Sequence, residues 1–192
     1  RVLHGHEPED RDVQVMYDES LPLQKETLAI RGSEVIPGIP EAVAKLRDLA
    51  LKIGSTTGYT RELMEVVTPI AARGGFAPDV IVCSDEVSAG RPAPWMNFRA
   101  AEQLGVYPMR SVVVVDDTPL GIAAGRNAGA ISIAVSQTGN ALGLSLAEVK
   151  ALPPAELQAR LTDIERQFLE AGAHLVIRAA PHLPQRSDDL LV

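Results

Sequence analysis

The stretch 111–117, Ser-Val-Val-Val-Val-Asp-Asp, constrains the fold more than any other part of the sequence. Four consecutive β-branched residues predict a strand that is apolar on both faces, as in a parallel sheet that helices cover on both sides. Other short apolar runs alternate with segments of helical periodicity, which is typical of βαβ units. These runs lie at 52–56, 79–84, 131–136 and 174–179. The sequence therefore predicts an α/β fold with a doubly wound parallel sheet.

Helical periodicity marks the segments between these runs. Pro40 falls in a first helical turn, where proline is tolerated, and apolar residues then recur at helical spacing up to Ala50. A short helix is also expected within 12–30, and another that ends at Lys150. The main helices are expected at 40–50, 60–73, 95–104, 120–128 and 154–171.

The composition limits the classes of partner. The net charge is −7 and no basic residues cluster, which argues against nucleic acid and against anionic membranes. Cys83 is the single cysteine, so an internal disulfide is excluded and a reducing compartment is favoured. No apolar run approaches the roughly 20 residues that span a bilayer. We therefore expect a soluble, cytoplasmic protein.

Polar residues follow three of the predicted strands, at the edge where parallel sheets bind ligands. Hydroxyl groups beside the backbone N–H groups of a helix start can hold an anion, and an arginine is suited to phosphate oxygens. Two adjacent carboxylates can bind Mg²⁺ together with a substrate phosphate. The residues concerned are Thr56, Thr57, Ser84, Asp85, Glu86, Arg91, Asp116 and Asp117.

Each part of this pattern also has a purely structural interpretation. The segment 54–60, Gly-Ser-Thr-Thr-Gly-Tyr-Thr, can be a plain loop with a helix N-cap. Residues 116–119, Asp-Asp-Thr-Pro, can be a capped turn before a helix, and 84–86 can be a loop that caps another helix. Arg91 can be a surface arginine in a proline-rich loop. The agreement of these features at consecutive strand ends favours a phosphate-handling site.

Several motifs resemble those of the haloacid dehalogenase superfamily. They are the hydroxyl-ended strand, the basic residue in GRPAPW at 90–95, and VVVVDDTPLGIAAGRNAG at 112–129. More narrowly, KIGSTTGYTRELMEVV, AGRPAPWMNFRAAEQLGVYPM and FLEAGAHLVI resemble the phosphonoacetaldehyde hydrolase (phosphonatase) family. This resemblance extends from about Asp12 to Ile177. The arginine in GRPAPWM, where most of the superfamily carries lysine, is its most specific element.

The resemblance implies a phosphate site. Thr57 would hold a phosphate oxygen through its hydroxyl, and Arg91 would bind the phosphate and orient the nucleophile. Gly58 and Tyr59 would line the substrate pocket, although Tyr59 could equally pack at a helix entry. These four residues lie within KIGSTTGYTRELMEVV and AGRPAPWMNFRAAEQLGVYPM, two of the segments that carry the resemblance.

The resemblance also implies a Mg²⁺ ion. Asp117 would lie on the metal or beside it, and Asp116 would be the second acid, in a tandem arrangement. The variant with a second aspartate four residues after Asp117 does not apply, because that position is Gly121.

The resemblance implies a reaction as well: hydrolysis of the C–P bond of phosphonoacetaldehyde to acetaldehyde and phosphate. Such enzymes use an aspartate nucleophile in a motif like Asp-x-x-Gly-Thr and a Schiff-base lysine in a helical cap. This sequence contains no such motif. Its lysines, none in a segment like the cap motif, are Lys25, Lys45, Lys52 and Lys150.

We therefore expect about 60 to 90 further N-terminal residues, enough for a first strand and most of a helical cap. The 192 residues alone are expected to be inactive. On this interpretation residues 1–35 are the remainder of the helical cap and a linker, 36–180 form the α/β core, and 181–192 form a loosely ordered tail. The family pattern also implies a homodimer formed through the cap.

Two alternatives remain open. The first is a superfamily phosphatase that acts on a small phosphate ester, and an upstream cap lysine would distinguish it from a phosphonatase. The second takes the 192 residues as the whole product: a non-catalytic phosphate-binding or interaction domain that pairs an orphaned sheet edge with another chain.

Overall fold

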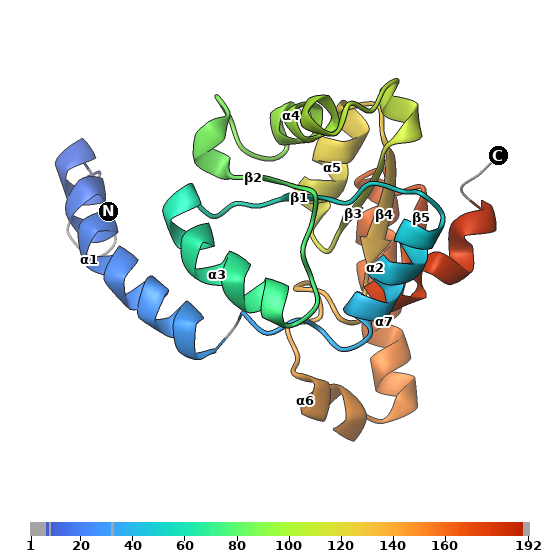
Figure 1. The fold of residues 1–192 in the computed structure, drawn as a ribbon. Coiled ribbons are helices and arrows are strands. Elements are labelled where there is room, and N and C mark those ends of the chain that lie inside the picture. The colour runs from blue at the N-terminus through green and yellow to red at the C-terminus, as the bar shows by residue number, and fades with distance from the viewer. Residues whose placement is uncertain (1–6, 8, 32, 190–192) are drawn as a thin grey trace.

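The computed structural model describes residues 7, 9–31 and 33–189. Helices and short parallel strands alternate through most of the chain, as the sequence predicts (Figure 1). The helices are α1 (Asp10–Ile30), α2 (Ile39–Asp48), α3 (Arg61–Arg73), α4 (Trp95–Leu104), α5 (Pro119–Asn127), α6 (Leu146–Ala151) and α7 (Pro154–Glu170). The strands are β1 (Gly54–Thr56), β2 (Val80–Val82), β3 (Val113–Asp116), β4 (Ile131–Val135) and β5 (Leu175–Ile177). Three 3-10 helices are η1 (Ser84–Glu86), η2 (Met109–Ser111) and η3 (Ala180–Asp189).

The strands form two parallel sheets. One has the order β1-β2 and the other has the order β3-β4-β5. Within the described residues, no pairing joins β1 to β3. The predicted α/β class with parallel strands is confirmed, and the parallel strands lie in two separate groups whose carboxyl ends carry the predicted site residues.

The main core surrounds β4, the central strand of the larger sheet. Ala134 points to one face, where the fully buried Ile122 of α5 and Phe168 of α7 pack. Ile133 and Val135 point to the other face, against β5 and the start of η3. The alternation follows from the two-residue period of a strand. A strand covered on both faces is what the apolar sequence of 131–135 predicts.

Strand β3 departs from that expectation. Val114 faces α5, where a side chain at Gly125 would press against it. Val113 and Val115 point to the opposite face and are 39% and 36% exposed. Among the described strands β3 pairs only with β4, so no neighbouring strand shields these two side chains along its other edge.

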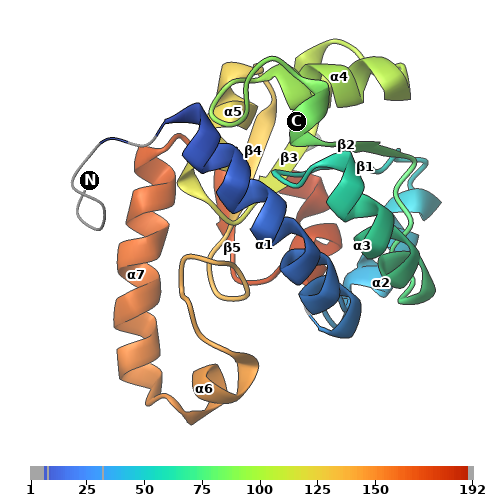
Figure 2. The same cartoon turned by 90° about the vertical axis from the view of Figure 1, so that its left-hand side faces the viewer.

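The helix near the start of the chain is longer than the short helix expected there. Helix α1 has 21 residues and lies beside α3 in both views of the fold (Figures 1 and 2). Lys25 of α1 forms an ion pair of 2.6 Å with Glu62 of α3, and Leu28 is buried. At the other end, η3 packs on α2 and β5, and residues 190–192 lie outside the described residues.

No helix in the described part of the chain combines the length and the apolar character that crossing a membrane requires.

Candidate active site

The guanidinium group of Arg91 connects the carboxyl ends of the two sheets. Its Nη2 donates hydrogen bonds to the carbonyl oxygen of Thr56 at 2.9 Å and to Thr56 Oγ1 at 3.1 Å. Its Nε lies 3.4 Å from Asp116 Oδ2, at the end of β3. The side chains of Arg91 and Asp116 are only 23% and 12% exposed. Arg91 is therefore not a free surface arginine, and the structure brings it together with the ends of β1 and β3.

The loop that carries Arg91 is held from a distant part of the chain. Asn127, the last residue of α5, donates from Nδ2 to the carbonyl oxygen of Pro92 at 2.9 Å. A turn bond from Ala93 N–H to the Gly90 carbonyl, at 3.0 Å, closes the same loop. Reasoning from the sequence missed this role of Asn127, because nothing in the spacing connects residue 127 with residue 92.

Asp116 is fixed by its own turn. Its Oδ1 accepts hydrogen bonds from Thr118 N–H at 2.9 Å and from the Thr118 hydroxyl at 2.8 Å. The same hydroxyl oxygen accepts from Gly121 N–H at 3.0 Å and so caps α5. The capped-turn interpretation of 116–119 is confirmed, and it is compatible with a site role because the cap aims the Asp116 carboxylate at Arg91.

Asp117 points into a different environment. Its Oδ2 accepts a hydrogen bond from Asn140 N–H at 2.7 Å, in the loop after β4. A side chain at Gly139 would press against the Cβ of Asp117 and the Val135 carbonyl oxygen, so the loop approaches closely there. Within the part of the chain that the structure describes, Asp117 Oδ1 forms no hydrogen bond or ion pair, so it is available to a ligand.

The carboxylates of Asp116 and Asp117 supply part of what a Mg²⁺ site needs. Among the described residues no three acidic, histidine or cysteine side chains gather as a metal site. Asp116 directs Oδ1 to Thr118 and Oδ2 to Arg91, which leaves Asp117 as the freer carboxylate. Mg²⁺ binds through one or two carboxylates and keeps water or phosphate oxygens as its other ligands. Asp116 and Asp117 could therefore hold the ion only together with water or phosphate oxygens.

The predicted phosphate loop lies beside this cluster. Thr57 N–H donates to the carbonyl oxygen of Val82 at 3.0 Å, and Thr57 Oγ1 accepts from Tyr59 N–H at 3.1 Å. The hydroxyl hydrogen of Thr57 can still donate to a ligand oxygen. Tyr59 is 41% exposed, which gives little support to the alternative that it packs at the entry to α3.

The start of α3 is occupied by a carboxylate of the protein itself. Asp85 accepts from Arg61 N–H, the first residue of α3, at 3.0 and 3.2 Å through its two oxygens. The Ser84 hydroxyl donates to the carbonyl oxygen of Gly58 at 2.9 Å. The helix-capping interpretation of Ser84–Glu86 is thus confirmed, and this N–H group of α3 already has a negatively charged acceptor.

Glu86 completes this cap. Its Oε2 lies 2.6 Å from Arg61 Nη2 and accepts from Cys83 N–H at 2.6 Å. The hydrogen bond from the Arg61 guanidinium, then that from the Cys83 amide, lower the pKa of Glu86 from its ordinary value of 4.5. The ion pair and the Asp85 cap hold the loop before α3 against η1.

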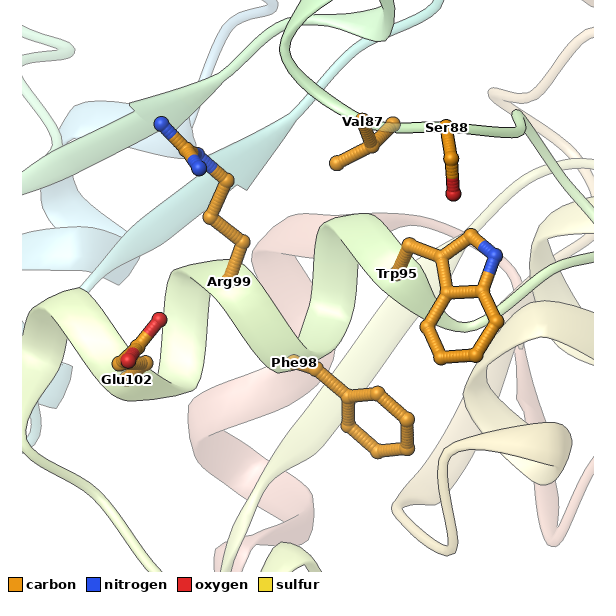
Figure 3. A pocket seen from close by; sticks show the side chains of 6 residues that line it. All are labelled: Val87, Ser88, Trp95, Phe98, Arg99 and Glu102. Carbon is orange, nitrogen blue, oxygen red and sulfur yellow. The ribbon is translucent and has the colours of Figure 1, made fainter.

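The hollow along α4 is a separate feature (Figure 3). Trp95 and Phe98 project from α4 with ring centroids 5.9 Å apart and are 45% and 38% exposed. The residues that line it are Val87, Ser88, Trp95, Phe98, Arg99 and Glu102. None of the residues predicted for the phosphate site is among them.

The lowered pKa of Glu86 predicts a pH dependence of stability. A carboxylate whose pKa is depressed on folding stabilises the folded state above its unfolded pKa, near 4.5, and loses that contribution as the pH falls through the folded value. We expect Glu86→Gln to remove this part of the acid destabilisation. Urea unfolding of the full-length protein from pH 7 to pH 3 measures it.

The matched control is Glu65→Gln, an exposed carboxylate on α3. This variant should keep the wild-type slope of unfolding free energy against pH below 4.5. Identical slopes for Glu86→Gln and wild type would show that the ion pair with Arg61 does not contribute as described.

Comparison with known proteins agrees with this geometry. The family model described as haloacid dehalogenase-like hydrolase matches residues 3–129. The phosphonoacetaldehyde hydrolase of Nitratidesulfovibrio vulgaris is 44% identical over 177 residues, which are 92% of this chain and 63% of that protein. The phosphonoacetaldehyde hydrolase of Syntrophobacter fumaroxidans is 43% identical over 194 residues, covering 100% of this chain and 70% of that protein.

A solved structure is also similar. The phosphonoacetaldehyde hydrolase-like protein from Oleispira antarctica superimposes with a TM-score of 0.91 at 33% sequence identity. The match covers 97% of this chain and 67% of that one. The chain therefore belongs to the haloacid dehalogenase-like hydrolases and, within them, to the phosphonoacetaldehyde hydrolase family.

Proposed function

We propose that the full-length protein hydrolyses the C–P bond of phosphonoacetaldehyde and releases acetaldehyde and phosphate. One observation carries the proposal: the half-buried Arg91 guanidinium lies between Thr56 and Asp116, where the two sheets end. A fixed guanidinium at strand ends is suited to a phosphonate dianion. The names of the matched relatives support the choice of substrate.

The residues of the phosphate loop have distinct proposed roles. Arg91 neutralises the phosphonate and directs it toward the nucleophile, and the Thr57 hydroxyl donates to one of its oxygens. Gly58 and Tyr59 line the pocket for the aldehyde end. Support for Tyr59 comes from its 41% exposure, since a residue that only packed at the helix start would be more deeply buried.

Mg²⁺ is the proposed cofactor. Asp117, with Oδ1 available, would hold the ion, and Asp116 would supply negative charge beside it. When bound, such an ion neutralises charge between an attacking carboxylate and the phosphoryl oxygens. Asp116 also has a task that needs no metal, because its carboxylate orients Arg91.

The covalent groups are assigned outside these 192 residues, in the part of the relatives that the chain does not match. A lysine amine would condense with the aldehyde and release water, giving an iminium ion. An aspartate oxygen would then attack phosphorus while the C–P bonding electrons move into the iminium, which becomes an enamine. Protonation and hydrolysis release acetaldehyde, and water cleaves the aspartyl phosphate.

The lysines of this chain lie on helices or make contacts with other parts of the α/β core. Lys25 is paired with Glu62 on α3, and Lys52 donates to the Leu104 carbonyl oxygen before β1 begins. Lys45 belongs to α2 and Lys150 to α6. This placement supports a Schiff-base lysine elsewhere in the protein.

The separation of the two sheets supports a nucleophile strand between β1 and β3. Such a strand would pair with the free edge of β3, flank the partly exposed Val113 and Val115, and place its carboxyl end beside Arg91. We further propose that the segment alone is inactive, and that the protein acts in the cytoplasm as a homodimer assembled through its cap.

Replacing Arg91 tests the phosphate site. Arg91→Ala should weaken binding of inorganic phosphate to the full-length protein by about 2–4 kcal/mol, because a charged contact in a closed site is lost. Titration calorimetry in the presence of Mg²⁺ measures this affinity.

Two control variants accompany it. Arg91→Lys keeps the charge but not the forked donor geometry and should lose less affinity. Arg160→Ala removes an exposed arginine on α7 and should leave phosphate affinity unchanged. Unaltered affinity in Arg91→Ala would remove this residue from the site.

Borohydride tests the reaction class. The full-length protein should release phosphate from phosphonoacetaldehyde, and borohydride added with the substrate should inactivate it by reducing the iminium to a stable secondary amine. Phosphate release and the mass of the trapped protein are the measurements.

A protein that hydrolysed phosphate monoesters equally well, without borohydride inactivation, would instead be a superfamily phosphatase. The site described here would then handle phosphate esters, and the proposed Schiff-base mechanism would be wrong.

A further inference from the structure

Gly121 leaves a space that another residue fills. It is a buried residue of the first turn of α5, and its backbone has no left-handed conformation that would explain a glycine. A Cβ built on Gly121 would fall onto the carboxylate of Asp116, whose Cγ and two oxygens would be its three nearest neighbours. The constraint on Gly121 is therefore the presence of Asp116.

Neither partner can move away without breaking other contacts. The Asp116 carboxylate is held on one side by Thr118 and on the other by Arg91. Gly121 N–H donates to the Thr118 hydroxyl, and the next residue, Ile122, is fully buried in the main core. A side chain at 121 would therefore displace the carboxylate more easily than the helix.

We infer that Gly121 is a positioning residue: the space left by its missing side chain lets Asp116 reach across the start of α5 and hold the guanidinium of Arg91 at the end of β1. The consequence for ligand affinity rests on the proposed phosphate site. The steric coupling between Gly121 and Asp116 does not depend on that site, so the coupling and the phosphate affinity can be tested separately.

A second glycine on the same helix provides a matched control. A Cβ at Gly125 would press against Ser132 Oγ and Val114, which belong to β4 and β3. None of its three nearest neighbours belongs to Asp116. Gly125→Ala should therefore be destabilising whether or not Asp116 is present.

A double-mutant cycle on the full-length protein tests the coupling. Gly121→Ala should lower Tm by about 5 °C in the wild-type background. In an Asp116→Gly background the same change should leave Tm unchanged or raise it by about 2 °C, since alanine then only replaces glycine in a helix. Gly125→Ala should lower Tm equally in both backgrounds.

Phosphate binding tests the positioning role, at a temperature where every variant is folded. Calorimetry with inorganic phosphate should show affinity at least about tenfold weaker in Gly121→Ala than in wild type, as expected when an ion-paired group is misplaced. Asp116→Gly and the double variant should bind phosphate equally. A change in Tm that is the same in both backgrounds would overturn the inference.

The inference would also fail if Gly121→Ala kept wild-type phosphate affinity while Arg91→Ala lost it. If phosphate affinity were insensitive to Arg91→Ala, the proposed phosphate site would fail instead, and the Tm cycle would still decide whether Gly121 accommodates Asp116.

Discussion

The contact of Arg91 with Thr56 and Asp116 is the interaction on which the site depends. The described strands form two parallel sheets without a shared pairing, so hydrogen bonds between strands do not fix the distance between the ends of β1 and β3. The guanidinium reaches both ends, with contacts of 2.9, 3.1 and 3.4 Å. Because a half-buried charge is costly without partners, these contacts also determine where Arg91 can lie.

Carboxylates near two helix starts serve different purposes. Asp85 accepts from the first N–H group of α3, and Glu86 reinforces that turn through Arg61. At α5 the cap is the Thr118 hydroxyl, which leaves the neighbouring Asp116 free to point at Arg91. The first arrangement stabilises the loop that carries the predicted phosphate residues, and the second builds the charged centre of the site.

Much of the fold could be predicted from periodicity and strand-end chemistry, because the apolar runs and helical segments are local signals. The convergence of Arg91 with Asp116 was predictable for a related reason, since parallel strands carry their ligand-binding residues at their carboxyl ends. Asp117 instead accepts a hydrogen bond from Asn140. The contact of Asn127 with Pro92 and the crowding of Gly121 by Asp116 could not be predicted, because both depend on how loops approach in space. The unpaired edge of β3, where Val113 and Val115 are partly exposed, agrees with the orphaned sheet edge that the motif resemblance implies.

A crystal structure of the full-length protein with Mg²⁺ and phosphate tests the central claim most directly. The account predicts phosphate oxygens in contact with the Arg91 guanidinium and the Thr57 hydroxyl, and a metal ion on Asp117. A phosphate bound elsewhere, with Arg91 directed into solvent away from Asp116, would contradict it.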